Sequence, residues 1–278
     1  MLKLLGAKPV GGRDLDDVRR VLDADPIASC MIASRVEECG VDPRMIHGEL
    51  WSRGGPSSSL CFAGANLVPL RGDIDSIRAF ADRACRIPRM CSSVVGRAEL
   101  ALPLWEMLEL DWGSAREVRA EQPLLAVSEP LSCLSDPLVR QVRPDELDIY
   151  LPAAVAMFIE EVGIDPRTND GGRGYRHRVA SLIASGRAWA RIDDGQVVFK
   201  AEVGSVSSRC GQIQGVWVNP EFRGRGYGVT GTAAVAESIM ATGRVASLYV
   251  NSFNTVARST YARVGFRQVA TFATVLLD

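Results

Sequence analysis

The stretch of the sequence best suited to chemistry runs from Val216 to Val229 and reads VWVNPEFRGRGYGV. An apolar strand pattern ends at Pro220, and a run of glycines and arginines then precedes a helical pattern. The first amide groups of a helix lack intrahelical acceptors and lie at the positive end of the helix dipole. Glycines let this backbone approach an anion closely and adopt positive φ. The pattern therefore predicts a cradle for a diphosphate, to which Arg223 and Arg225 add positive charge.

Two better-known phosphate-binding motifs do not describe this stretch. A P-loop needs a lysine followed by serine or threonine after the glycines, and the sequence has neither at that place. A dinucleotide-binding fold places its glycines after the first strand, whereas several antiparallel strand signals precede them here. A plain reversal of the chain is the remaining alternative for a glycine-rich turn.

Two motifs together resemble the GNAT superfamily of acetyl-CoA-dependent N-acetyltransferases. The family signature Arg/Gln-x-x-Gly-x-Gly/Ala is matched by Arg223, Gly226 and Gly228, and a V-x-V-x-P pattern precedes it. The segment LYVNSFNTVARSTYARVGF, residues 248–266, is similar to the family's fifth strand, the helix after it and the Tyr-x-x-x-Gly-Phe ending. The resemblance covers residues 138–278.

The resemblance implies how acetyl-CoA is bound. Main-chain groups of a bulged fourth strand bind the pantetheine and polarise the thioester carbonyl, and amides of the glycine-rich turn hold the pyrophosphate. Asn254 contacts the cofactor arm, and Tyr261 lies near the sulfur, where it protonates the departing thiolate. The residues alone also allow another interpretation of each. Asn254 is suited to be a helix N-cap, and Tyr261 is suited to be an aromatic residue of the core. The residues assigned to acetyl-CoA are Val216, Trp217, Val218, Arg223, Gly224, Arg225, Gly226, Tyr227, Gly228, Val229, Asn254 and Tyr261.

The implied reaction is direct attack of a neutral primary amine on acetyl-CoA, with the oxyanion stabilised by fourth-strand amides. Some members use a glutamate on the fifth strand as the base, but Tyr249 occupies that position here. The alternatives are Glu202 on the third strand, which we take as the catalytic candidate, Glu160, a water chain, Glu161 at the end of the long predicted helix, or Asp165 in the loop after it. The last two lie in the segment that forms the acceptor wall in the family, so they are also candidates for binding a cationic acceptor.

The elements that position these residues follow from hydrophobic periodicity. Antiparallel hairpin signals followed by β-α-β predict a mixed, mostly antiparallel sheet with flanking helices, in an α/β (α+β) protein of GNAT type. Lys200 shares a predicted strand with Glu202, and we expect it to form a cross-strand ion pair rather than to catalyse. The predicted strands of the second half are 138–143, 187–192, 197–203, 211–218, 247–250 and 269–277, and its predicted helices are 150–162, 175–184, 229–242 and 255–264.

In the first half, alternating strand and helix patterns predict a smaller α/β domain. Its predicted helices are 14–24, 26–39, 74–85 and 98–108, and its predicted strands are 60–65, 91–95 and 118–125. The segment SEPLSCLSDP, residues 128–137, is the predicted boundary between domains 1–130 and 131–278. The order of elements suggests a degenerate copy of the same fold, as in tandem GNAT proteins such as the mycothiol synthases. An unrelated α/β cap is the alternative.

The first half lacks a second Arg-x-x-Gly-x-Gly, so we expect it not to bind acetyl-CoA. Its function would be structural, or it would shape the acceptor pocket. Its histidine and tryptophans are expected to pack rather than to bind ligands: His47, Trp51, Trp105 and Trp112.

Composition excludes several other classes of protein. The chain has 278 residues, 47% hydrophobic residues and a net charge of −1, which is typical of a soluble globular protein and offers no global attraction for nucleic acid. Seven cysteines without a C-x-x-C pair, and two histidines, predict neither a zinc site nor a disulfide framework, so no metal is expected. The absence of a signal-peptide pattern or a stretch of about 18 apolar residues predicts a cytoplasmic protein without a membrane partner.

The leading hypothesis is thus an N-acetyltransferase whose partners are acetyl-CoA and a primary amine of a small molecule, peptide or protein. The missing fifth-strand glutamate leaves a non-catalytic acyl-CoA-binding regulator as one alternative. Aminoacyl transfer in the manner of the Fem-type tandem GNAT enzymes is another. The sequence identifies neither the acceptor nor the oligomeric state.

Overall fold

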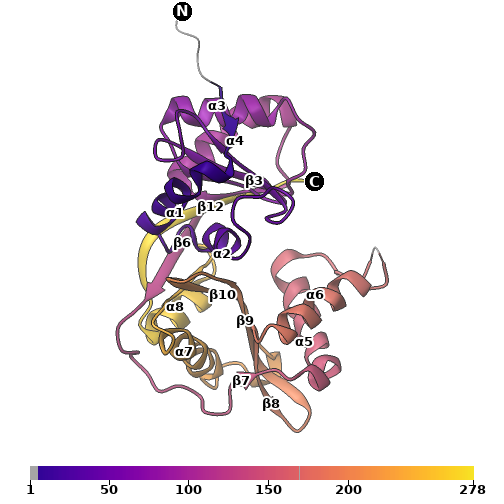
Figure 1. Ribbon diagram of the computed structural model, residues 1–278. Helices are drawn as coiled ribbons and strands as arrows, with labels where there is room; N and C mark the ends of the chain where they lie inside the picture. Colours follow the sequence, from indigo (N-terminus) through magenta and orange to yellow (C-terminus); the bar gives the residue numbers. More distant parts are fainter. Residues whose placement is uncertain (1–5, 169) are drawn as a thin grey trace, which may run out of the picture.

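Residues 6–168 and 170–278 are described by the structure, a computed structural model (Figure 1). The strands are β1 (Lys8–Pro9), β2 (Gly48–Ser52), β3 (Leu60–Gly64), β4 (Leu67–Arg71), β5 (Ser93–Arg97), β6 (Glu117–Val127), β7 (Arg140–Gln141), β8 (Ala188–Asp193), β9 (Gln196–Val206), β10 (Cys210–Val218), β11 (Val245–Tyr249) and β12 (Arg267–Leu276). The α-helices are α1 (Leu15–Ala24), α2 (Cys30–Cys39), α3 (Ile74–Ala84), α4 (Ala98–Trp112), α5 (Leu147–Val162), α6 (Arg173–Ala184), α7 (Tyr227–Met240) and α8 (Thr255–Val264).

One twelve-stranded sheet runs through both halves of the chain, in the order β1-β2-β3-β4-β5-β12-β6-β11-β10-β9-β8-β7. Between the described strands, only β4–β5 and β10–β11 are parallel neighbours. The mixed, mostly antiparallel sheet expected for the second half is therefore confirmed, and it continues into the first half.

The two halves exchange their last strands. β12 ends the second half but pairs with β5, from Phe272 opposite Arg97 to Leu276 opposite Ser93. β6 ends the first half but pairs with β11 of the second half. β6 and β12 also pair with each other at the centre of the sheet. Each half therefore depends on a strand of the other half to complete its part of the sheet.

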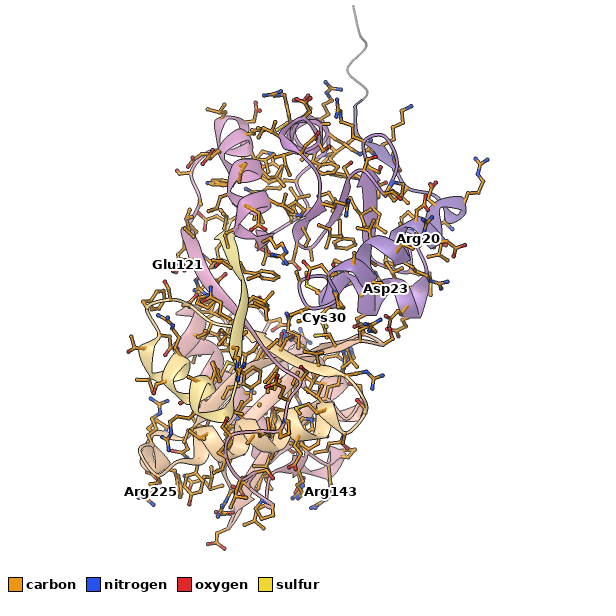
Figure 2. All side chains as sticks on the ribbon, turned by 90° about the vertical axis from the view of Figure 1, so that its left-hand side faces the viewer. Arg20, Asp23, Cys30, Glu121, Arg143 and Arg225 are labelled. Carbon is orange, nitrogen blue, oxygen red and sulfur yellow. The ribbon has the colours of Figure 1, made fainter. Side chains whose placement is uncertain are left out.

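Helices cover both faces of the sheet (Figure 1). In the first half, α3 and α4 pack on one face and α1 and α2 on the other. In the second half, α7 and α8 pack on one face and α5 and α6 on the other. α2 also reaches the second half, because the thiol of Cys30 donates to the carbonyl oxygen of Cys210 at 3.3 Å. Figure 2 shows Cys30 where the two halves meet.

The expected packing residues of the first half behave differently from one another. Trp51 and Trp105 are buried, and Trp112 packs half-buried against the same core. The prediction for His47 is wrong: it is exposed in a turn with φ of +52°, because the chain reverses there immediately before β2. All seven cysteines are free thiols.

Two further observations on the described residues concern membrane-spanning helices and metal-binding clusters. No helix among them has the length and apolar character needed to cross a membrane. No three His, Cys, Asp or Glu side chains gather in the described part of the chain in a way that would hold a metal ion.

Candidate functional site

Strand β10 carries a bulge. Its register against β9 shifts between Gln214 and Trp217, so Gly215 and Val216 have no opposite residue on β9. Gly215 has φ of +55°, a conformation that glycine adopts readily. β10 pairs with its parallel neighbour β11 only over 210–212, and no register joins the two strands beyond that point. The bulge therefore leaves backbone groups of β10 unpaired where the two strands separate.

The glycine-rich turn leaves the start of α7 open. Gly224 and Gly226 have φ of +76° and +89°, and a Cβ atom built on either would meet no other atom within 4 Å. Gly226 is the N-cap of α7, and no side chain caps the first amides. The Val229 amide donates to the carbonyl oxygen of Gly226 at 3.0 Å, whereas the amides of Tyr227 and Gly228 have no acceptor among the described residues. These two N–H groups lie at the positive end of the helix, which suits a pyrophosphate.

A cavity of about 1330 Å³ lies between the two halves and joins the β10 bulge to the start of α7. We call it the shared cavity, because α2, β4, β5 and β6 of the first half line it together with α5, α6, β10 and α8 of the second half. All residues assigned to acetyl-CoA line it except Arg225. Pockets for single small ligands measure roughly 300–1000 Å³. The shared cavity therefore has room for a cofactor-sized molecule and a second ligand.

The two arginines of the glycine-rich turn have different surroundings. Arg223 donates through Nε to the carbonyl oxygen of Val218 at 3.0 Å and through Nη2 to Glu160 at 2.7 Å. Arg223 therefore ties the turn to β10 and α5. Arg225 is exposed, lies over the ring of Phe222 at 5.4 Å, and appears at the outer surface in Figure 2.

Asn254 immediately precedes α8, and Tyr261 lies within the second half of that helix. Asn254 Oδ1 accepts a hydrogen bond from the Ala257 amide at 3.1 Å, so it is the N-cap of α8, and it also lines the shared cavity. Tyr261 is 7% exposed, packs edge-on against Phe266 and lines the same cavity. Burial raises the pKa of Tyr261 far above its ordinary value, with Glu161 adding to the rise. The phenol therefore keeps its proton at neutral pH, as a proton donor must.

Glu161 is the carboxylate whose surroundings best suit a base. It lines the open shared cavity and is exposed to the solvent there. Partial desolvation by the surrounding atoms raises the pKa of Glu161, while the positive charges of Lys200 and Arg119 oppose the rise. No ion pair within 4.0 Å engages Glu161 in the described part of the chain, so its carboxylate remains available to a ligand.

Two other candidate carboxylates are engaged elsewhere. Glu160 Oε2 accepts hydrogen bonds from Trp217 Nε1 at 3.1 Å and from Arg223. Asp165 pairs with Arg167 at 2.7 Å and lies outside the lining of the shared cavity. The structure thus brings Glu160 to the β10 side of the site and keeps Asp165 apart from it.

Glu202 is bound to other side chains of the protein. It is 3% exposed, and its Oε1 accepts a hydrogen bond from Lys200 Nζ at 2.7 Å. Its Oε2 accepts from Gln214 at 3.3 Å and lies 3.9 Å from Arg178 Nη2. Burial opposes ionisation, yet the neighbouring Lys200 ammonium lowers the pKa of Glu202. The expected ion pair with Lys200 is confirmed, but it lies within strand β9 rather than across strands. A carboxylate so strongly stabilised in its ionised form is a weak proton acceptor.

The first half supplies polar residues that the sequence did not single out. Gln122 on β6 is buried; its Nε2 donates to Asn251 Oδ1 at 2.8 Å, and its Oε1 accepts from Thr274 at 2.6 Å. Arg119 on the same strand has a side chain that is 14% exposed and pairs with Glu117. Both line the shared cavity. No local motif marks them, because only the strand exchange brings β6 beside β11.

The corresponding helix start in the first half is closed. Asp73 is the N-cap of α3, and its carboxylate accepts a hydrogen bond from the Ser76 amide at 2.9 Å. A Cβ atom built on Gly72 would lie 2.8 Å from Ser76 Cβ. An incoming pyrophosphate would therefore meet a negative charge and an amide that already has an acceptor. This geometry supports the expectation that the first half does not bind acetyl-CoA.

Comparisons with known protein families match two separate segments of the chain. Residues 199–275 match the family described as FR47-like protein, and residues 48–150 match a domain of unknown function, DUF4081. No curated protein sequence matches the chain. The FR47-like match lies within the segment that resembles the GNAT superfamily and supports that resemblance.

The GNAT fold extends across both halves. A GNAT-family acetyltransferase from Colwellia psychrerythraea is similar over 98% of this chain and 99% of its own, with 10% identity and a TM-score of 0.58. A GCN5-related N-acetyltransferase from Sphaerobacter thermophilus is similar over 99% and 96%, with 15% identity and a TM-score of 0.57. A tandem GNAT protein from the clavulanic acid biosynthesis pathway is similar over 97% and 98%, with 15% identity and a TM-score of 0.54. At such identities the likeness establishes the fold, which is consistent with two GNAT-like halves in tandem.

Proposed function

We propose that this protein is an N-acetyltransferase that transfers the acetyl group of acetyl-CoA to a primary amine by direct attack. The observation that carries the proposal is the convergence of three features on one cavity. These are the bulged β10, the uncapped start of α7 and the buried phenol of Tyr261. The remaining arguments concern how each group would act.

The acetyl-CoA end of the site would use mainly backbone. Amides of residues 224–229 would hold the pyrophosphate, because the space around Gly224 and Gly226 is empty and no side chain caps the helix. Backbone groups of Val216, Trp217 and Val218 on the edge of β10 that no longer pairs with β11 would bind the pantetheine and polarise the thioester carbonyl. Bound acetyl-CoA supplies the activated acyl group.

The acceptor end would use Glu161 as the base, in place of Glu202, the candidate favoured by the sequence. An ammonium group first loses one proton to solvent. The nitrogen of the neutral amine then attacks the carbonyl carbon, and Glu161 accepts the proton that this nitrogen loses as the amide forms. As the new N–C bond forms and the C–S bond breaks, Tyr261 gives its proton to the departing thiolate. Transfer of the proton from Glu161 to Tyr261 through water restores both groups.

We further propose that the chain divides at 128–137 into the units 1–130 and 131–278, which exchange their last strands. The first unit would then have a role in forming the acceptor side of the cavity rather than in binding a second acetyl-CoA.

The test combines calorimetry of acetyl-CoA binding with a thiol-trap assay of CoA release across a panel of amines and peptides. We expect micromolar binding and amine-dependent release of CoA. Binding without release for any amine would favour a non-catalytic acyl-CoA-binding protein, and absence of binding would refute the proposal altogether.

A further inference from the structure

The acceptor end of the shared cavity is built by both halves. From the first half it is lined by Met31 and Ile32 on α2, by Asn66 next to β4 and by Ser93 on β5. From the second half it is lined by residues of α5 and α6, among them Tyr175. An acceptor that reaches the β10 bulge through this cavity therefore contacts the first half as well as the second.

Most charged groups around this end are already paired. Lys200 is bound to Glu202 and Glu160 to Arg223, each at 2.7 Å, so these groups add little net charge. Glu161 remains as a carboxylate without an ion-pair partner in the described part of the chain. A cationic amine entering the cavity would therefore be attracted to Glu161.

Arg119 supplies a guanidinium from the other half. Its charge is balanced by Glu117, so it would act on a ligand chiefly as a hydrogen-bond donor. Its Nε and Nη2 donate to the two oxygens of Glu117 at 2.9 and 3.0 Å, which fixes the orientation of the guanidinium. Within the described residues its Nη1 has no hydrogen-bond acceptor, and the residue lines the shared cavity. A guanidinium held in one orientation with donors to spare suits a planar carboxylate.

Arg119 and Glu161 act on the same region of the cavity. Tyr249 lines the same cavity as both groups. Partial desolvation raises the pKa of its phenol, Glu161 adds to the rise and Arg119 opposes it. The guanidinium and the carboxylate come from β6 and α5, which belong to different halves. The cavity thus presents a positive and a negative group to one ligand.

We infer that the acceptor is an amino acid or a similar small amine with a carboxylate, bound with its amine at Glu161 and its carboxylate at Arg119. This inference rests on the proposed acetyltransferase function and deepens it. Arg119 is then a specificity-determining residue that the first half supplies to a reaction carried out on the second half.

The test compares amines that differ only in the carboxylate: lysine with cadaverine, and glycine with glycinamide. Binding of each is measured by saturation-transfer difference NMR without acetyl-CoA, and turnover is measured by CoA release. We expect the carboxylated member of each pair to have the higher kcat/KM by about 10-fold or more, as for hydrogen bonds to a charged group. Equal binding and equal turnover within the pairs would overturn the inference.

Variants assign the preference to Arg119. Arg119→Gln should reduce the preference for the carboxylated amine to near 1, whereas the matched change Arg116→Gln, at an exposed arginine just before β6, should leave it intact. A preference that survives Arg119→Gln would refute the role of Arg119. The NMR measurement does not need turnover. Selective binding without CoA release would therefore contradict the proposed function alone, and CoA release without selectivity would contradict only this inference.

Discussion

Lys200 Nζ donates to Glu202 Oε1 at 2.7 Å, and both side chains are buried directly behind the bulge of β10. A Cβ atom built on Gly215 would lie 3.2 Å from Lys200 Nζ and 3.6 Å from Glu202 Cδ. The ammonium also lies 5.4 Å from the centre of the Tyr150 ring. The ion pair therefore supports the strand segment at which acyl transfer is proposed to occur. Together with Met157, whose Cε would lie 2.9 Å from a Cβ atom at 215, it leaves little space for a larger residue there.

A substitution that removes one charge of this pair is expected to destabilise the fold more than a double substitution that removes both charges. Lys200→Met leaves Glu202 buried without its partner and should reduce the free energy of unfolding by about 3–5 kcal/mol. The double change Lys200→Met with Glu202→Leu should recover most of that loss, because no buried charge remains. Urea denaturation of the three proteins measures both effects. A double variant as unstable as Lys200→Met would show that the positions act through packing and not through charge.

The sequence predicts the second half well because its elements carry strong local signals. The helix 255–264 matches α8 to the residue, since Asn254 caps its start and Gly265 follows its end. The sequence does not predict β4, because Pro69 interrupts its strand pattern and has no backbone N–H to donate. The exchange of β6 and β12 has no local signal at all, because it depends on which strand of the other half lies alongside. The placement of Arg119 and Gln122 in the shared cavity could not be predicted for that reason.

The open start of α7 can be tested with a matched pair of glycines that flank the helix, one at its start and one just beyond its end. Gly226 and Gly243 have φ of +89° and +77°, and both have free space around a built Cβ. Alanine at either position should cost about 1–2 kcal/mol of stability through left-handed strain. Only Gly226→Ala changes the amides proposed to hold the pyrophosphate. We expect acetyl-CoA affinity to fall at least 10-fold for Gly226→Ala and to stay unchanged for Gly243→Ala, as measured by calorimetry. Equal losses of affinity would contradict a specific role for Gly226.

Tyr261→Phe removes the proposed proton donor and keeps the ring that packs against Phe266. General acid catalysis contributes roughly 10²–10⁴-fold, so kcat should fall by about that factor. Acetyl-CoA affinity should change little, because the cofactor is held mainly by backbone groups. Single-turnover measurement of CoA release, together with calorimetry, separates the two effects. Unchanged turnover would exclude Tyr261 as the donor.

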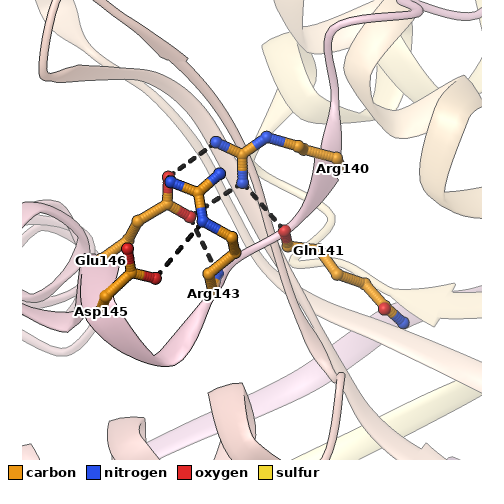
Figure 3. A network of polar contacts seen from close by, with 5 residues as sticks. All are labelled: Arg140, Gln141, Arg143, Asp145 and Glu146. Atoms are coloured by element: carbon orange, nitrogen blue, oxygen red, sulfur yellow. Dashed lines mark hydrogen bonds and ion pairs between the residues drawn. The ribbon is translucent and has the colours of Figure 1, made fainter.

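The start of α5, the helix that carries Glu161, is anchored by the network in Figure 3. Arg140 donates to both oxygens of Glu146, at 2.7 and 2.8 Å, and the Arg143 amide donates at 2.8 Å. The Arg140 hydrogen bond, more than any other contact, lowers the pKa of Glu146 from 4.5 to about 2, and burial opposes this. The stabilisation is therefore complete above pH 4.5 and is lost as the pH falls towards 2.

Glu146→Gln should accordingly reduce the free energy of unfolding by about 1–3 kcal/mol at pH 7. The difference from the unmodified protein should shrink steadily below pH 4.5. Asp145→Asn is the control, because its side chain is 73% exposed and its ion pair with Arg143 contributes at most about 1 kcal/mol. Urea titrations at several pH values measure both variants. A pH-independent loss for Glu146→Gln would contradict the electrostatic origin.

Glu161→Gln should lower activity and raise stability at the same time. Desolvation by the cavity walls raises the pKa of Glu161, so its contribution to stability is present below 4.5 and is lost as the pH rises through the higher, folded-state pKa. At neutral pH the neutral glutamine avoids that loss, and the melting temperature should exceed that of the unmodified protein; near pH 4 the two should agree. As the proposed base, Glu161 must be ionised, so kcat/KM should rise with pH through the same pKa. The variant should lose that dependence together with about 10²-fold in kcat. Asp165→Asn, outside the cavity, should retain the pH profile; a Glu161→Gln enzyme with an unchanged profile would require another base.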